Sequence, residues 1–201
     1  MGRAFAETGA TERSLVFLAV GAEESGLLGA KYYAANPLYS LAKTVGVINT
    51  DAPGVHGPMR DFSISGNAKL GLLDILTEEA ADLGRRYSPD PNPAAGSFFR
   101  SDHFAFAKAG VPAVSFRSGR DLVDGGTERA AAISATYAAE DYHQQSDEWS
   151  PDWDLSGLVN DATLIYAVAE RLGNGREWPN WAEGSEFKAT RDASAADRER
   201  E

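Results

Sequence analysis

Residues 14–29 read SLVFLAVGAEESGLLG and decide the expected fold. The run from 14 to 20 is continuously apolar and has the length of a strand, which is typical of a strand covered on both faces. Two adjacent glutamates, Glu23 and Glu24, follow this run, and residues 24–35 have the pattern of a helix. A buried strand that leads through a tight turn into a helix is the repeating unit of an α/β fold.

The same alternation continues along the chain. Residues 1–7 read as the end of a helix. Further strands are predicted at 44–50, 60–65 and 111–116, and further helices at 70–86, 102–109 and 155–172. We therefore expect a three-layer α/β domain with a mostly parallel (mixed) central sheet and helices on both faces. We place this domain at residues 1–192 and a charged, disordered tail at 193–201.

Composition narrows the class of partner. The 201 residues include no cysteine, which excludes disulfides, thiolate metal sites and cysteine nucleophiles. The net charge of −11 argues against nucleic acid and against anionic membrane surfaces as partners, because both require a basic face. No apolar run approaches the ~20 residues that span a bilayer, and residues 1–13 lack the apolar segment of a signal peptide.

Acidic residues follow the first two expected strands. Glu23 and Glu24 come after the first strand, and Asp51 ends the second. Ligands of open α/β sheets bind beyond the carboxyl ends of the strands, so these carboxylates are expected to converge on one crevice. Close carboxylates repel, and a divalent cation would relieve the repulsion while leaving one of them free as a general base. Taken alone, the glutamates also suit an acidic helix N-terminus and Asp51 suits a turn.

Two later motifs add side chains of the same kind. The segment YHQQSD at 142–147 supplies an imidazole, the commonest metal-ligating side chain, although a lone histidine is more often structural. The segment RSDH at 100–103 precedes an expected strand. Its Asp102 and His103 either orient metal ligands from behind, or Ser101 and Asp102 simply cap and balance the charge of the 102–109 helix.

In this order, the motifs together resemble peptidase family M28, zinc peptidases that include bacterial aminopeptidases and glutamate carboxypeptidases. The matching segments are RSLVFLAVGAEESGLLG at 13–29, NTD at 49–51, RSDH at 100–103, GVPA at 110–113, YH at 142–143 and SD at 146–147. The resemblance runs from residue 1 to about 192. The segments GPMRD at 57–61 and GSEFK at 184–188 are similar to a bacterial branch whose members are usually secreted or periplasmic.

The resemblance implies a site with two zinc ions that act together on a peptide substrate. Glu23 would be the general base that activates the bridging water. Glu24 would bind one zinc ion, Asp51 the other, and His143 would be a terminal ligand. Tyr142 resembles the tyrosine that helps to stabilise the tetrahedral intermediate in some members.

The residues of the RSDH motif, Arg100, Ser101, Asp102 and His103, would lie behind the ligands or in the substrate pocket. The family's site has five protein ligands. Two of them, a histidine in a His-x-Asp motif and an aspartate that bridges the metals, have no counterpart in this sequence.

This departure sets the expectation for the chain alone. We expect it to lack the first strands of the sheet, to bind zinc weakly or as a single ion, and to show little or no peptidase activity. An unpaired sheet edge would also favour aggregation. Two alternatives remain beside the zinc exopeptidase: a catalytically inactive fragment or binding module, and a glutaminyl-cyclase-like acyltransferase on the same fold.

Overall fold

In the computed structural model, the described residues are 1–51 and 54–198. Within them, strands β1 (Val47–Thr50), β2 (Asp61–Ile64), β3 (Arg86–Tyr87) and β4 (Ala113–Ser118) form one sheet in the order β1-β4-β2-β3. β1 pairs with β4 and β2 with β3 in parallel, whereas β2 and β4 are antiparallel. The mixed α/β sheet that the sequence predicts is thereby confirmed.

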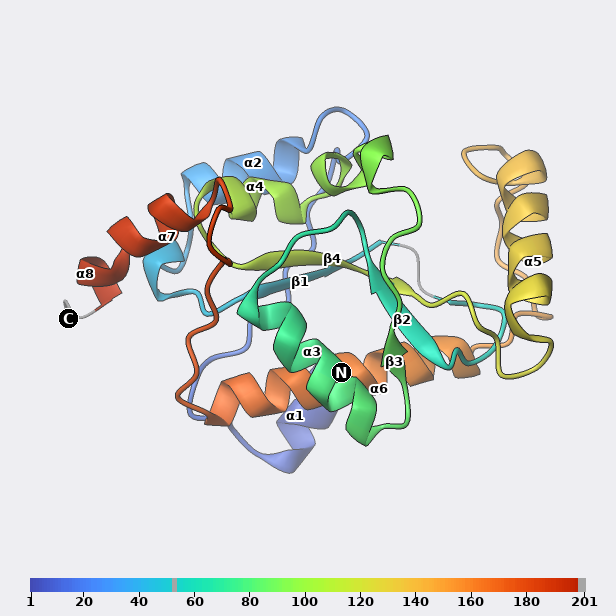
Figure 1. Ribbon diagram of the computed structural model, residues 1–201, viewed down its shortest axis with the longest axis horizontal. Coiled ribbons are helices and arrows are strands. Elements are labelled where there is room, and N and C mark those ends of the chain that lie inside the picture. The colour runs from blue at the N-terminus through green and yellow to red at the C-terminus, as the bar shows by residue number, and fades with distance from the viewer. Residues whose placement is uncertain (52–53, 199–201) are drawn as a thin grey trace.

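Helices cover both faces of this sheet (Figure 1). On one face α2 (Leu28–Ala35) packs with α4 (His103–Lys108), and on the other α3 (Gly71–Asp82) packs with α6 (Ser156–Asn174). The remaining helices are α1 (Gly2–Thr8), α5 (Gly126–Glu140), α7 (Lys188–Ala193) and α8 (Ala195–Arg198), with short 3-10 turns η1 (Leu41–Lys43), η2 (Pro93–Ala95) and η3 (Ser97–Arg100). None of the described helices is both long and apolar enough to cross a bilayer.

The core lies on both sides of β2 and β4, and the first four residues of β4, from Ala113 to Phe116, are all buried. The rings of Phe62 on β2 and Phe116 on β4 stack 5.7 Å apart. Leu76 of α3 and Leu164 of α6 are fully buried in the same cluster. Helical spacing in the sequence places such residues on one face of each helix, and that face is the one that covers the sheet.

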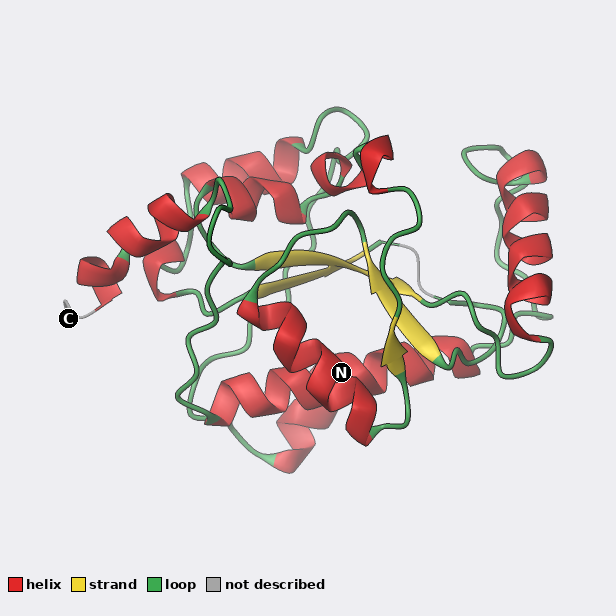
Figure 2. Cartoon of the chain, viewed as in Figure 1, coloured by secondary structure: helices red, strands yellow, loops and turns green. Residues whose placement is uncertain are grey.

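Residues 14–20 are the main departure from the prediction. They were expected to form a buried strand, but the structure has an irregular connection there between α1 and α2 (Figure 2). Val16, Phe17 and Leu18 remain 52%, 59% and 43% exposed. A strand needs a neighbouring backbone to accept its hydrogen bonds, and among the described residues this segment pairs with none of the four strands of the sheet. The strand prediction for 14–20 is therefore wrong for the chain as it stands.

The expected cap of the 102–109 helix is also wrong. α4 begins at His103 with Asp102 at the capping position, and no side chain caps it. The hydroxyl of Ser101 donates instead to the carboxylate of Asp51. A charged acceptor makes the stronger hydrogen bond, so the hydroxyl is oriented by Asp51 rather than by the helix end.

One helix boundary and the C-terminal tail also differ from the prediction. The helix predicted at 24–35 begins only at Leu28, because residues 23–27 form a turn. Where a disordered tail is predicted, α8 occupies Ala195–Arg198, and 199–201 lie outside the described residues. The domain boundary at residue 192 stays a prediction.

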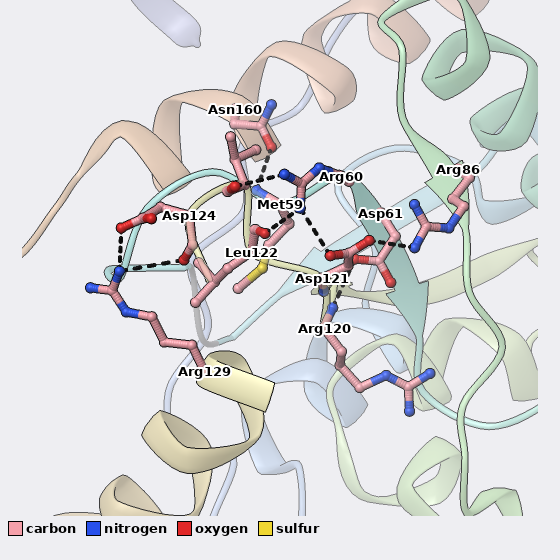
Figure 3. Close-up of polar contacts among 11 residues, drawn as sticks. Met59, Arg60, Asp61, Arg86, Arg120, Asp121, Leu122, Asp124, Arg129 and Asn160 are labelled. Atoms are coloured by element: carbon pink, nitrogen blue, oxygen red, sulfur yellow. Dashed lines mark hydrogen bonds and ion pairs between the residues drawn. The ribbon is translucent and has the colours of Figure 1, made fainter. Parts of the chain in front are cut away.

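A buried aspartate fixes the loop that follows β4 (Figure 3). Asp61 accepts hydrogen bonds from the backbone N–H groups of Arg120 (2.8 Å) and Asp121 (2.9 Å). Residue 119 must be glycine, because a Cβ at Gly119 would lie 1.9 Å from the Asp61 carboxylate. This loop leads into α5, so the position of that helix depends on Asp61.

A second buried charge joins three elements. The guanidinium of Arg85 donates to the Asp161 carboxylate of α6 (2.7 Å) and to the backbone carbonyl of Asp61 on β2 (2.7 Å). The other carboxylate oxygen of Asp161 accepts a hydrogen bond from Ser118 at the end of β4. Both charges are almost fully buried, so neither is stable without the other.

We predict that Asp161→Ala destabilises the protein by about 3–5 kcal/mol, because it leaves the Arg85 charge buried and unpaired. Urea unfolding followed by circular dichroism measures the loss. Asp124→Ala is the matched control, since Asp124 also pairs with an arginine but is exposed. Equal effects of the two changes would contradict the role given to the buried pair.

We predict that the exposed apolar side chains at 16–18 promote self-association, and that Phe17→Lys weakens it by about tenfold or more because it removes one of them. Sedimentation velocity over a range of concentrations tests this. Leu83→Lys is the control, since Leu83 is comparably exposed but lies at the end of α3. If Leu83→Lys has the larger effect, the segment at 14–20 does not cause the association.

Candidate active site

The adjacent glutamates lie on a strained turn. Glu23 accepts backbone hydrogen bonds from Gly26 (2.9 Å) and Leu27 (2.8 Å), which closes the turn before α2. Ala22 and Leu27 have φ values of 59° and 60°, in the left-handed region that side chains other than glycine rarely adopt. A Cβ at Gly29 would lie 2.6 Å from the carbonyl oxygen of Gly21, so only glycine lets the turn fold back this tightly. Such strain is concentrated at functional sites.

Asp51 follows β1 directly and is held by two polar neighbours. The Asn49 side chain donates to one carboxylate oxygen of Asp51 (3.0 Å) and to the hydroxyl of Ser101 (2.7 Å). Ser101 donates to the other oxygen. The orientation of Asp51 is therefore set by β1 and by the segment that precedes α4.

His143 comes from a distant part of the chain and meets the glutamate turn. Its Nε2 lies 3.1 Å from a carboxylate oxygen of Glu24, and both side chains are largely exposed. The backbone of His143 is also left-handed, with a φ of 60°. The rings of Tyr142 and His143 stack with centroids 3.9 Å apart. The structure thus brings together Glu24, His143 and Tyr142.

The segment that carries His143 follows α5 and is held mainly by its own contacts. The Tyr137 hydroxyl donates to Asp147 (2.8 Å), and this carboxylate raises the pKa of Tyr137 to about 12. Ser146 donates to the backbone carbonyl of Glu140 (2.7 Å). α5 stands apart from the layers (Figure 1), and Ala130 is its one buried residue.

Glu23 lies within the electrostatic reach of the other candidates. Burial makes the largest contribution and raises the pKa of the Glu23 carboxyl. The imidazole of His143 lowers this pKa. Three nearby carboxylates raise it further, those of Glu24, Asp51 and Asp102. The acidic groups therefore share one region, as their places after β1 and after residues 14–20 predict.

The remaining RSDH residues differ among themselves. The His103 ring is 0% exposed, and neither of its nitrogens has a hydrogen-bond partner among the described residues. Burial lowers the pKa of His103 to about 4, so the ring is neutral. Burial and then the charge of Asp51 raise the pKa of Asp102. Arg100 turns away and donates to the backbone carbonyl of Ala95 in its own loop.

The donor types suit zinc, but their arrangement within this chain does not complete a zinc site. Carboxylate and imidazole are both common zinc ligands. However, no three His, Asp or Glu side chains among residues 1–51 and 54–198 are grouped to hold one metal ion. Glu24 and His143 pair with each other, and Asp51 is bound to Ser101 and Asn49.

The sequence matches the model of peptidase family M28 over residues 1–167. The chain belongs to peptidase family M28. All of the candidate residues, from Glu23 to His143, lie within the matched range.

One solved protein structure is similar to this chain and is longer than it. An aminopeptidase from Aneurinibacillus sp. strain AM-1 is similar with a TM-score of 0.48 and 20% sequence identity. The similarity covers 79% of this chain and 33% of that one, so the M28 chain spans about a third of that aminopeptidase. No curated protein matches the sequence.

Asn49 is the residue of this M28 site that sequence reasoning missed. It lies two positions before Asp51 on β1, and residues i and i+2 of a strand point to the same side. An amide placed there is within reach of the Asp51 carboxylate. That spacing places Asn49 beside Asp51, although an aspartate that ends a strand does not by itself indicate a hydrogen-bonding partner two residues before it.

We predict a pH effect for the buried imidazole. Unfolded His103 takes up its proton near pH 6.5, whereas folded His103 takes it up only near pH 4, so stability falls as the pH falls through this window. His103→Leu removes the titrating group. As the pH falls from 6.5 to 4, the free energy of unfolding of this variant should therefore rise relative to that of the wild type by up to about 3 kcal/mol. Urea unfolding at a series of pH values measures it, with exposed His56→Leu as control. Parallel stability curves for wild type and His103→Leu would rule the effect out.

Proposed function

We propose that this chain is part of the catalytic domain of a zinc-dependent exopeptidase that removes residues from the N-terminus of peptides. The observation that carries the proposal is the contact between Glu24 and His143, 3.1 Å apart, from segments widely separated in the sequence. Membership of family M28 supports the peptidase class. No contact among the described residues favours the acyltransferase alternative.

We assign the ligand role to Glu24, Asp51 and His143, because these side chains present carboxylate and imidazole groups. Asn49 and Ser101 would hold Asp51 in place by the hydrogen bonds that they make now. Such supporting hydrogen bonds fix the orientation of a ligand and strengthen binding.

Glu23 would be the proton acceptor of the reaction. It sits next to Glu24 on the same turn but makes no ion pair among the described residues, so its carboxylate is free to take a proton from water. Tyr142 stacks on His143 and would present its hydroxyl to the oxygen that becomes negative during hydrolysis. Asp102 and His103 would support the site from behind, and Arg100 would lie at the substrate pocket, held by its hydrogen bond to Ala95.

We further propose that the chain by itself is impaired. Three ligands shared between two ions would leave each ion under-coordinated, and in this structure two of the three ligands satisfy one another. Additional ligands from outside this chain would be needed to hold zinc tightly. The isolated chain then behaves as the inactive or binding-only fragment that the sequence also allows.

The test uses the chain purified without metal and titrated with zinc, with zinc content and hydrolysis of a chromogenic amino-acid anilide measured on the same samples. We expect at most one weakly bound zinc ion and little or no turnover. Glu24→Ala and His143→Ala should each weaken zinc binding by about tenfold or more, since losing even a supporting partner of a ligand costs 10–100-fold.

His56→Ala and Glu128→Ala are the matched controls, because both remove the same side-chain types outside the candidate site. If the controls weaken zinc binding as much as the site variants do, the ligand assignment is wrong. Tight binding of two zinc ions with turnover would disprove the impairment while supporting the peptidase.

A further inference from the structure

Three guanidinium groups surround one indole at the C-terminal end of the fold. The Cζ atoms of Arg13, Arg191 and Arg198 lie 5.2, 5.3 and 5.2 Å from the ring centroid of Trp178. Each distance is within the range of a cation–π contact. Three positive charges at one ring must also repel each other, and a single indole offers only a modest attraction to each.

The hydrogen bonds of this cluster, named here the Trp178 cluster, are all made to neutral groups. Arg13 donates to the carbonyls of Leu172 (2.8 Å) and Glu177 (3.1 Å). Arg191 donates to the backbone carbonyls of Thr44 and Val45, which precede β1. Arg198 donates to the backbone carbonyl of Arg191. None of the ion pairs among the described residues involves any of the three arginines.

Several donors of the Trp178 cluster have no acceptor. Each guanidinium carries five N–H groups, and the three make five hydrogen bonds to the protein between them. The Nε atoms of Arg191 and Arg198 are buried without a partner among the described residues. Arg191 as a whole is only 1% exposed.

The charged form of Arg191 is disfavoured in this arrangement. Burial, and after it repulsion by Arg198, lower the pKa of Arg191 to about 10. Charged side chains are almost never fully buried unless they are paired. A buried arginine without a carboxylate is especially unusual in a protein whose net charge is −11.

We propose that the Trp178 cluster binds an oxyanion of the phosphate or sulfate type. Glu177 and Asp192 act electrostatically on Arg13 and Arg198 without forming an ion pair with them, and among the described residues no carboxylate is hydrogen-bonded to Arg191. A tetrahedral oxyanion supplies a negative charge and several acceptors at once, and guanidinium groups bind it through paired N–H donors. Trp178 is 38% exposed, and Arg13 and Arg198 are half-buried, so the cluster is open to solvent on one side.

This site is separate from the candidate active site. Trp178, Arg191 and Arg198 lie beyond the residues 1–167 that match the family model. α7 and α8 are at one end of the molecule and α5 is at the other (Figure 1). The proposal therefore stands or falls independently of the peptidase function.

The experiment titrates inorganic phosphate into the full chain at constant ionic strength, with sodium chloride making up the balance. Calorimetry and tryptophan fluorescence follow binding. We expect a saturable signal with phosphate and with sulfate, and none with chloride. Non-specific stabilisation by these salts does not saturate, so saturation separates binding from exclusion effects.

Arg198→Ala should weaken phosphate binding by about tenfold or more, because it removes one charged donor group. Trp178→Phe should keep binding but lose most of the fluorescence change. Arg129→Ala, an exposed arginine of α5, is the matched control and should bind as the wild type does. Loss of binding in the control, or retention in Arg198→Ala, would overturn the assignment.

The acidic residues Glu199 and Glu201 follow Arg198 in the sequence and lie outside the described residues. A chain ending at Arg198 is therefore titrated in parallel, and we expect it to bind phosphate as the full chain does. Binding seen only in the shortened chain would mean that the protein's own carboxylates fill the cluster, and the proposal would fail.

Discussion

A buried guanidinium must be neutralised, and this requirement at Arg85 organises the fold. Its partners belong to β2 and α6, and through Asp161 it also reaches the end of β4. The loop that leads to α5 begins at the end of β4. Because removing one charge would strand the other, the arrangement tolerates little variation. The start of the segment that carries α5 and His143 is therefore tied to the buried pair through β4.

The sequence predicts the parts of the fold in which local pattern and burial agree. The strand at 111–116 is predicted from short, mostly small or apolar residues that become buried in β4, and α3 and α6 show helical spacing because one face of each packs on the sheet. Residues 14–20 show the limit of this reasoning, since an apolar run becomes a strand only beside another strand. β3, with only Arg86 and Tyr87, is too short to leave a pattern.

The candidate site was predictable in its residue types but not in its contacts. Acidic groups after successive strands indicate a shared crevice, and Glu23 and Asp51 do influence each other. No spacing rule could show that Glu24 and His143 lie in contact, or that Ser101 serves Asp51 rather than a helix end. The Trp178 cluster was equally hidden, because Arg198 belongs to the stretch at 193–201 that reads as a charged tail and Arg13 lies far from it in the sequence. These contacts depend on tertiary folding, which places residues from separate segments together.

α5 buries a single residue, and this has a consequence for how the site behaves over time. Helices with so little buried surface open locally at a small fraction of the free energy that global unfolding requires. Glu23, Glu24 and Asp51 belong to segments that pack on the sheet and its helices, whereas His143 follows α5. The segments that carry the carboxylates are therefore expected to stay folded while the segment that carries His143 opens and closes locally. Amide hydrogen exchange and proteolytic cleavage would both begin in α5 and in the segment from α5 to His143.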